Sequence, residues 1–221
     1  PLDEIRRGVH ASHDLHVHRL VRPGDVLSTS AVVTAVEQRA PGAHLMLRLD
    51  TVDAAGRAVA TTWQGSLYLG ADTDGPDRQI EQAPAPVRSP RDAPLGDEAV
   101  TVDVPIGGLD AHVYTECARI WNPIHTDPAS AALAGLPAII LHGTATLARA
   151  VSVVVNGSLA GDPNRVRRLG CRFGAWVPMP STLRVRVGAV DGSGVIALDA
   201  ATTTPGSGSG LALAGGYVVV S

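Results

Sequence analysis

Two short segments of the chain hold residue types that can move protons and stabilise negative charge. Asn122-Pro-Ile-His125 places a histidine just after a proline turn, and Leu141-His-Gly143 places a glycine before an apolar run. A histidine accepts and returns protons at neutral pH. A glycine amide in the first turn of a helix has no partner within the helix and lies at the positive end of the helix dipole. Together they suit proton abstraction next to a carbonyl whose oxygen the amide holds.

The two segments resemble the paired motifs of the MaoC-like hydratases and dehydratases, hotdog-fold proteins that add water to acyl thioesters or remove it. The family pattern is Gly-Asp-x-Asn-Pro-x-His, in which the aspartate shares catalysis with the histidine. In this chain Arg119 and Ile120 stand at the first two positions. The resemblance implies catalytic roles for His125, Asn122 and Gly143, and it leaves the role of the aspartate without its usual residue.

The same motifs predict a set of substrate-binding residues around the histidine. These are Ile120, Trp121, Glu116 and His142. Glu116 precedes Ile120 by four residues, so in a helical turn the two would share a face, and Glu116 is one candidate to replace the missing aspartate. Asp127 is the other, but it precedes Pro128 and is better explained as a helix N-cap.

Some of these residues also have structural interpretations. Asn122 either orients the reacting groups or only forms the Asn-Pro turn, and Gly143 either offers its amide or only allows close packing of helix on sheet. His142 is interpreted as a hydrogen-bonding residue rather than a second base. The sequence leaves these alternatives open.

Composition excludes several classes of function. All 18 basic residues among the 221 are arginine, which excludes a Schiff-base lysine and a phosphate-loop lysine. The net charge of −3 offers no electrostatic basis for nucleic-acid binding. Two cysteines, Cys117 and Cys171, form no disulfide framework. Apolar runs fall short of the roughly 20 residues that span a bilayer. We expect a soluble cytoplasmic protein without nucleic-acid or membrane partners.

Four histidines near the start of the chain raise the question of a metal. They are His10, His13, His16 and His18. His16 and His18 would share one face of a strand, but metal sites need three or four convergent ligands, and no CxxC or HExxH motif accompanies them. We interpret them as polar residues on a strand edge. We predict no metal and no cofactor, apart from coenzyme A or phosphopantetheine as part of the substrate.

The chain divides into two similar halves. Residues 71–97 are rich in Pro, Asp, Gly and Gln without periodicity, which indicates a linker. The turn at 21–27 leads into a predicted strand at 28–34, as the turn at 177–183 leads into one at 184–188. Further strands are predicted at 45–49, 65–69, 195–198 and 216–220. We predict a hotdog unit at 1–70, a linker at 71–97, and a second hotdog unit at 98–221 that carries the site.

Only the second half shows a clear helix. Residues 143–155 are small or apolar nearly all round, apart from Arg149, as a helix wrapped by a sheet requires. Val153–Val155 alone would also suit a surface strand. A shorter helix should begin at Pro128 and end before the Gly135-Leu-Pro137 break. The fold class is therefore α+β: an antiparallel double-hotdog sheet around one long buried helix, with the helix of the first unit absent or reduced.

These observations predict a lyase that acts on an acyl thioester carried by coenzyme A or an acyl carrier protein. Loss of the aspartate should impair dehydration less than hydration, because His125 alone can take the α-proton and return it to the departing β-hydroxyl. A cyclase or isomerase of a natural-product pathway stays open, as does a catalytically silent acyl-binding protein. The assembly, a monomer or a homodimer, also stays open.

Overall fold

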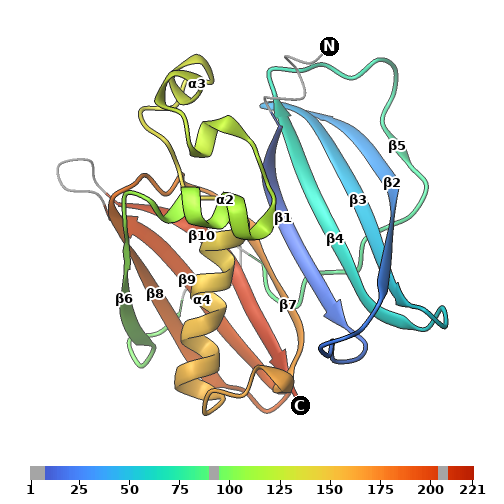
Figure 1. Cartoon of the computed structure of the whole chain (residues 1–221), viewed down its shortest axis with the longest axis vertical. Helices are drawn as coiled ribbons and strands as arrows, with labels where there is room; N and C mark the ends of the chain where they lie inside the picture. Colours follow the sequence, from blue (N-terminus) through green and yellow to red (C-terminus); the bar gives the residue numbers. More distant parts are fainter. Residues whose placement is uncertain (1–7, 90–94, 204–208) are drawn as a thin grey trace.

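The computed structural model describes residues 8–89, 95–203 and 209–221, and within them the chain forms one large antiparallel sheet. Its strands are β1 Gly8–Val17, β2 Leu27–Arg39, β3 Gly42–Asp53, β4 Ala58–Leu69, β5 Arg78–Gln79, β6 Val100–Ile106, β7 Val166–Phe173, β8 Ser181–Val190, β9 Val195–Thr203 and β10 Ser209–Val220. They follow the order β5-β2-β3-β4-β1-β7-β10-β9-β8-β6 (Figure 1). Every strand predicted from alternation lies inside one of these.

The sheet is built from two like units joined edge to edge. The order β2-β3-β4-β1 in the first half is mirrored by β8-β9-β10-β7 in the second. The units meet where Ser12–His16 of β1 pair with Arg172–Arg168 of β7. Strand β1 is thus hydrogen-bonded on both sides, to β4 and to β7. The expectation that its histidines lie on a strand at the edge of the sheet was wrong. The partner strand β7 lies more than 150 residues further along the chain, so the sequence around the histidines does not reveal the pairing.

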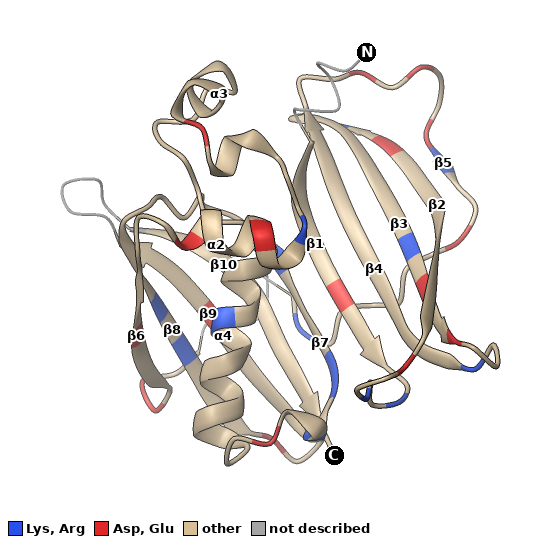
Figure 2. Ribbon diagram, in the orientation of Figure 1, with Lys and Arg blue, Asp and Glu red and all other residues tan. Residues whose placement is uncertain are grey.

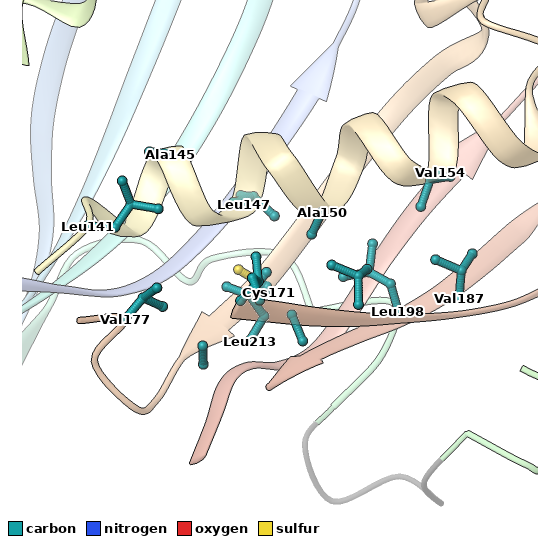
Figure 3. Packing of buried hydrophobic residues seen from close by; sticks show 14 of the residues in the cluster. Leu141, Ala145, Leu147, Ala150, Val154, Cys171, Val177, Val187, Leu198 and Leu213 are labelled. Atoms are coloured by element: carbon teal, nitrogen blue, oxygen red, sulfur yellow. The ribbon is translucent and has the colours of Figure 1, made fainter. Parts of the chain in front are cut away.

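The long helix α4, Gly143–Ser158, packs against β8, β9 and β10 in the second unit. Figure 3 shows Leu147, Ala150 and Val154 pointing at the sheet, where they meet side chains such as Leu198, and Ala145 belongs to the same buried cluster. Alanines bring the helix close to the strands because they add little volume. The prediction of a wrapped helix is confirmed, and the alternative strand at Val153–Val155 is wrong.

The remaining helices lie between β6 and α4 or just after α4. They are α2 Asp110–Ala118, η1 Pro123–His125, α3 Pro128–Leu133 and η2 Pro163–Arg165. Asp127 caps α3 as predicted, because its carboxylate accepts hydrogen bonds from the amides of Ala129 and Ser130. Helix α4 carries one charged segment in Figure 2, and by sequence this is Arg149, which pairs with Asp110 of α2 at 2.7 Å.

The described residues of the first unit and of the connector up to residue 89, which are residues 8–89, contain no helix. Between the end of β4 at Leu69 and the start of β6 at Val100, the described residues add only β5, which pairs with β2. From β5 to residue 89, the described connector passes behind the sheet (Figure 1). Within the described chain, no helix is long and apolar enough to cross a membrane.

Candidate active site

His125 ends the short helix η1, which Asn122 begins. The side chain of Asn122 accepts a hydrogen bond from the amide of Ile124, so Asn122 does shape this turn. The imidazole of His125 is 9% exposed, and its Nδ1 donates to the carbonyl of Ile140 at 2.8 Å. A neutral imidazole carries one proton, so this bond places it on Nδ1 and leaves Nε2 as an acceptor.

Burial keeps His125 uncharged at neutral pH. The pKa of His125 is lowered from 6.5 to about 4, chiefly by desolvation and to a lesser degree by the neighbouring His142, while the bond to Ile140 acts in the opposite direction. The Nε2 atom of His125 is therefore unprotonated over the whole physiological range.

His142 stacks on His125, with ring centroids 3.6 Å apart and planes inclined by 24°. Its Nε2 donates to the carbonyl of Ile120 at 3.3 Å and lies 3.3 Å from the hydroxyl of Thr115. Burial lowers the pKa of His142 as well, so the stack is a pair of neutral rings. These contacts tie the start of α4 to the end of α2, as expected of a structural hydrogen-bonding residue.

Gly143 is the first residue of α4, and no side chain caps this end of the helix. Its amide is therefore one of the first-turn donors without a partner inside the helix. A Cβ built on Gly143 would lie 3.2 Å from ring carbons of Phe173. The close approach that glycine allows between helix and strand is therefore present.

His125, Asn122 and Gly143 border one cavity of about 260 Å³, which His142 does not line. Its polar lining includes Asn122, His125 and Thr146, and the backbone of Gly143 also lines it. The first unit contributes Gly8, Val9, His10, Ala11, Leu67 and Leu69. These residues reach the site because β1 pairs with β7 only from Ser12 onward. The start of β1 therefore separates from β7 and leaves a space between the two units. No aspartate or glutamate occurs among the described residues that line the cavity.

All four predicted substrate-binding residues, His142 included, lie outside that lining. Ile120 is 41% exposed and Trp121 is 65% exposed, while Glu116 accepts a hydrogen bond from the Trp121 indole at 3.4 Å. Helix α2 ends at Ala118, and Arg119 takes a left-handed conformation with φ 56°. Because the helix ends before Ile120, Glu116 and Ile120 do not share a helical face as expected. Their contact with substrate stays a prediction.

His10 and Phe173 line the cavity and were missed by the sequence analysis. The two rings lie 4.6 Å apart, and His10 Nε2 is 3.3 Å from His13 Nδ1. Burial, helped by His13, lowers the pKa of His10 to about 3. A register shift between His10 and Ser12 brings both imidazoles together, and nothing in the sequence marks that bulge.

Comparison with known proteins identifies the family. Residues 92–205 match the MaoC like domain, and residues 2–62 match the dehydratase domain region of FAS1-like proteins. The peroxisomal enoyl-CoA hydratase 2 of Arabidopsis thaliana is 43% identical over 53 residues, which are 24% of this chain and 17% of that protein. Among the curated relatives compared, the match spans between 4% and 55% of the relative.

Solved structures share the fold. A MaoC-like dehydratase from Phytophthora capsici superposes with a TM-score of 0.82 at 22% identity, covering 98% of this chain and 72% of that one. A Mycobacterium tuberculosis protein described as a double hotdog superposes at 0.64 with 17% identity, covering 97% and 76%. The predicted double-hotdog fold is thereby confirmed. The match to the MaoC like domain also covers more than half of the residues of this chain, and the chain therefore belongs to the MaoC-like family.

Proposed function

We propose that the protein is a hydratase or dehydratase of acyl thioesters, acting on a 3-hydroxyacyl or enoyl group carried by coenzyme A or an acyl carrier protein. The observation that carries the proposal is the tautomer of His125: its Nδ1 proton is held by Ile140, so Nε2 is the base in a cavity that Gly143 also lines. The name of the plant relative, an enoyl-CoA hydratase, supports the same class of reaction.

In the dehydration direction, the thioester oxygen accepts a hydrogen bond from the amide of Gly143. His125 Nε2 then takes the α-proton, and the electron pair of the C–H bond moves into the enolate that the amide stabilises. As the enolate collapses, the bond between Cβ and the hydroxyl oxygen breaks and the double bond forms. The departing hydroxide takes the proton back from Nε2, so the products are an enoyl thioester, water and the neutral imidazole. Hydration is the reverse.

A panel of thioesters tests this proposal. The purified protein is incubated with 3-hydroxyacyl and enoyl thioesters on coenzyme A and on a carrier protein, and the products are read by mass spectrometry. We expect gain or loss of one water in the wild type and in His18→Ala, whose histidine lies outside the cavity, but not in His125→Ala. Equal turnover in both variants would contradict the role of His125.

One observation favours a second candidate, an isomerase or cyclase. The described lining of the cavity holds no carboxylate to orient an external water beside His125. A reaction that moves the α-proton within the substrate, or closes a ring with the substrate's own hydroxyl or amine, needs no such group. These products keep the mass of the substrate but change its ultraviolet absorbance, so the same incubations separate the two candidates. A panel with no turnover would favour a silent acyl-binding protein.

A further inference from the structure

A second cavity, of about 270 Å³, lies between the sheet and the connector, and it shares only Ala11 with the cavity of His125. Its walls are partly apolar and partly cationic. Met46 and Trp63 line it on the sheet side, and Pro84 and Pro86 of the connector line the opposite side. Such a mixture of apolar surface and a few charged groups is typical of sites for small organic ligands.

The connector is held in place over the sheet by arginines. Arg168 of β7 donates to the carbonyl of Ala85 at 2.9 Å, and Arg88 pairs with Asp199 of β9 at 2.8 Å. The side chain of Arg88 is largely buried in this pair. Because both contacts join the connector to strands of the second unit, the cavity is formed before any ligand arrives.

The cavity carries unbalanced positive charge. Its acidic residue, Asp14, is already neutralised: Arg168 donates to it at 2.9 Å, and the hydroxyl of Tyr217 donates at 2.8 Å. Arg39 pairs with Glu37. The side chain of Arg172, an exposed residue of β7, makes neither an ion pair nor a hydrogen bond to any of the residues that the structure describes. One guanidinium at the cavity is therefore left to bind an anion.

His44 adds a buried polar group to the same wall. Its side chain is 4% exposed, and its Nδ1 has no hydrogen-bond partner in the described chain, since the nearest carboxylate oxygen, of Glu37, is 3.7 Å away. Burial and then the charge of Arg39 lower the pKa of His44, Glu37 acts in the opposite direction, and Arg172 lowers the pKa further, so both guanidiniums act on this ring. Buried polar atoms are normally paired, and an unpaired one calls for a ligand or another explanation.

Gly65 makes room for this arrangement. A Cβ at that position would lie 3.0 Å from Nε2 of His44 and 2.3 Å from the hydroxyl of Ser12. The imidazole therefore occupies space above β4 that any other residue would fill, next to a serine that also lines the cavity.

We propose that this second cavity binds a small organic carboxylate with an apolar or aromatic body. The carboxylate would pair with Arg172 and hydrogen-bond to His44, and the body would lie against Met46, Trp63 and the prolines. A bare inorganic anion would leave those apolar walls uncovered. The inference goes beyond the proposed function, since it needs neither turnover nor a thioester.

Isothermal titration with 2-naphthoate tests the proposal, with the neutral 2-naphthylmethanol and inorganic phosphate as comparison ligands. We expect 2-naphthoate to bind better than either. Arg172→Gln should weaken its binding by about tenfold or more, the effect of losing a charge-assisted contact. Arg167→Gln removes the same charge from another exposed position on the same strand, but outside the cavity, and it should change the affinity by less than about twofold.

Three results would overturn the inference. Equal binding of 2-naphthoate and 2-naphthylmethanol would show that charge has no part, and equal effects of the two arginine variants would show that Arg172 has no special place. Competition between 2-naphthoate and crotonyl-coenzyme A would place the ligand in the other cavity. The variant His125→Ala should bind 2-naphthoate as the wild type does, so this test is independent of whether the protein is a hydratase.

Discussion

At His125, one hydrogen bond decides which nitrogen can do chemistry. Donation from Nδ1 to Ile140 leaves Nε2 unprotonated, and stacking on His142 fixes the plane of the ring. Histidines that act as bases are commonly oriented by a second group in this way. Here that group is the backbone carbonyl of Ile140, which accepts the hydrogen bond from Nδ1 and carries no charge.

Replacing His125 by alanine is expected to lower turnover by about 10²- to 10⁴-fold, the usual contribution of a positioned base. The chain should still fold, because His125 lies in a short loop helix rather than in the sheet or α4. Thioester assays give turnover, and circular dichroism with thermal melting gives the fold. Turnover within a few-fold of the wild type, in protein that melts normally, would reject the assignment.

The pH dependence of kcat/KM should reflect the lowered pKa of His125. Since the pKa is about 4, Nε2 is unprotonated above that pH, and kcat/KM should be flat from about pH 5.5 to 8 and fall only on further acidification. A half-maximal rate near pH 6.5 would instead indicate a solvated histidine.

Acid stability must be followed in the same buffers. The folded-state pKa values of His10 and His125 lie below 6.5, so under acid conditions the unfolded chain binds more protons. Stability should therefore decline as the pH falls from about 6.5 towards 4, by up to about 1.4 kcal/mol per pH unit for each such group. Thermal melting across this range separates loss of the base from loss of the fold.

At the scale of the element, α4 serves the core along its length and the site at its first residue. Its alanines and valines pack on β8, β9 and β10, while the uncapped start at Gly143 borders the cavity. Packing fixes where the helix begins. The amide therefore holds its position without support from a capping side chain.

A pair of substitutions separates the two roles of Gly143. Gly143→Ala adds a Cβ beside Phe173 but keeps the amide, whereas Gly143→Pro adds the same atom and removes the N–H. Proline suits the first helical position, and His142 already has the extended conformation that a following proline requires, with φ −59° and ψ 140°. If the amide holds the thioester oxygen, the proline variant should be slower than the alanine variant by about 10²- to 10³-fold.

The assay for both variants is kcat at saturating thioester, with thermal melting as a check on packing. Equal rates in the two variants would mean that the close contact with Phe173 is all that Gly143 provides.

At the scale of the whole molecule, joining the two units creates the site cavity. The first unit, which has no helix in its described part, supplies one wall of this cavity. A neighbouring cavity of about 460 Å³ shares four lining residues with the cavity of His125: Val9, Leu69, Ile124 and Trp176. The space next to His125 therefore continues along apolar side chains. This favours acyl groups larger than a four-carbon chain.

Cyclic or polyketide-like acyl thioesters are accordingly expected to have higher kcat/KM than crotonyl thioesters. Val9→Phe, which narrows the shared wall, should reduce kcat/KM for the bulky substrates and spare crotonyl thioester. Val32→Phe, on the exposed strand β2, is the matched control and should change neither. A wild-type preference for four-carbon substrates would contradict the expectation.

Local chemistry along the sequence was enough to predict much of this protein. Alternation identified strands in both halves, the apolar run from Gly143 identified α4, and the Asp127-Pro128 pair identified the start of α3. The resemblance to the MaoC-like motifs implied that His125 and Gly143 serve one site, and the structure places both on one cavity. The strands and helices themselves depend on neighbours a few residues away, which a sequence displays directly.

What only the tertiary structure decided depends on contacts between distant segments. The pairing of β1 with β7 moved the histidines from an expected edge to the centre of the sheet and brought Val9 and His10 to the site. The left-handed turn at Arg119 kept Glu116 and Ile120 outside the cavity lining. Partners of such pairs are chosen by the packing of the whole chain, so no local pattern records them.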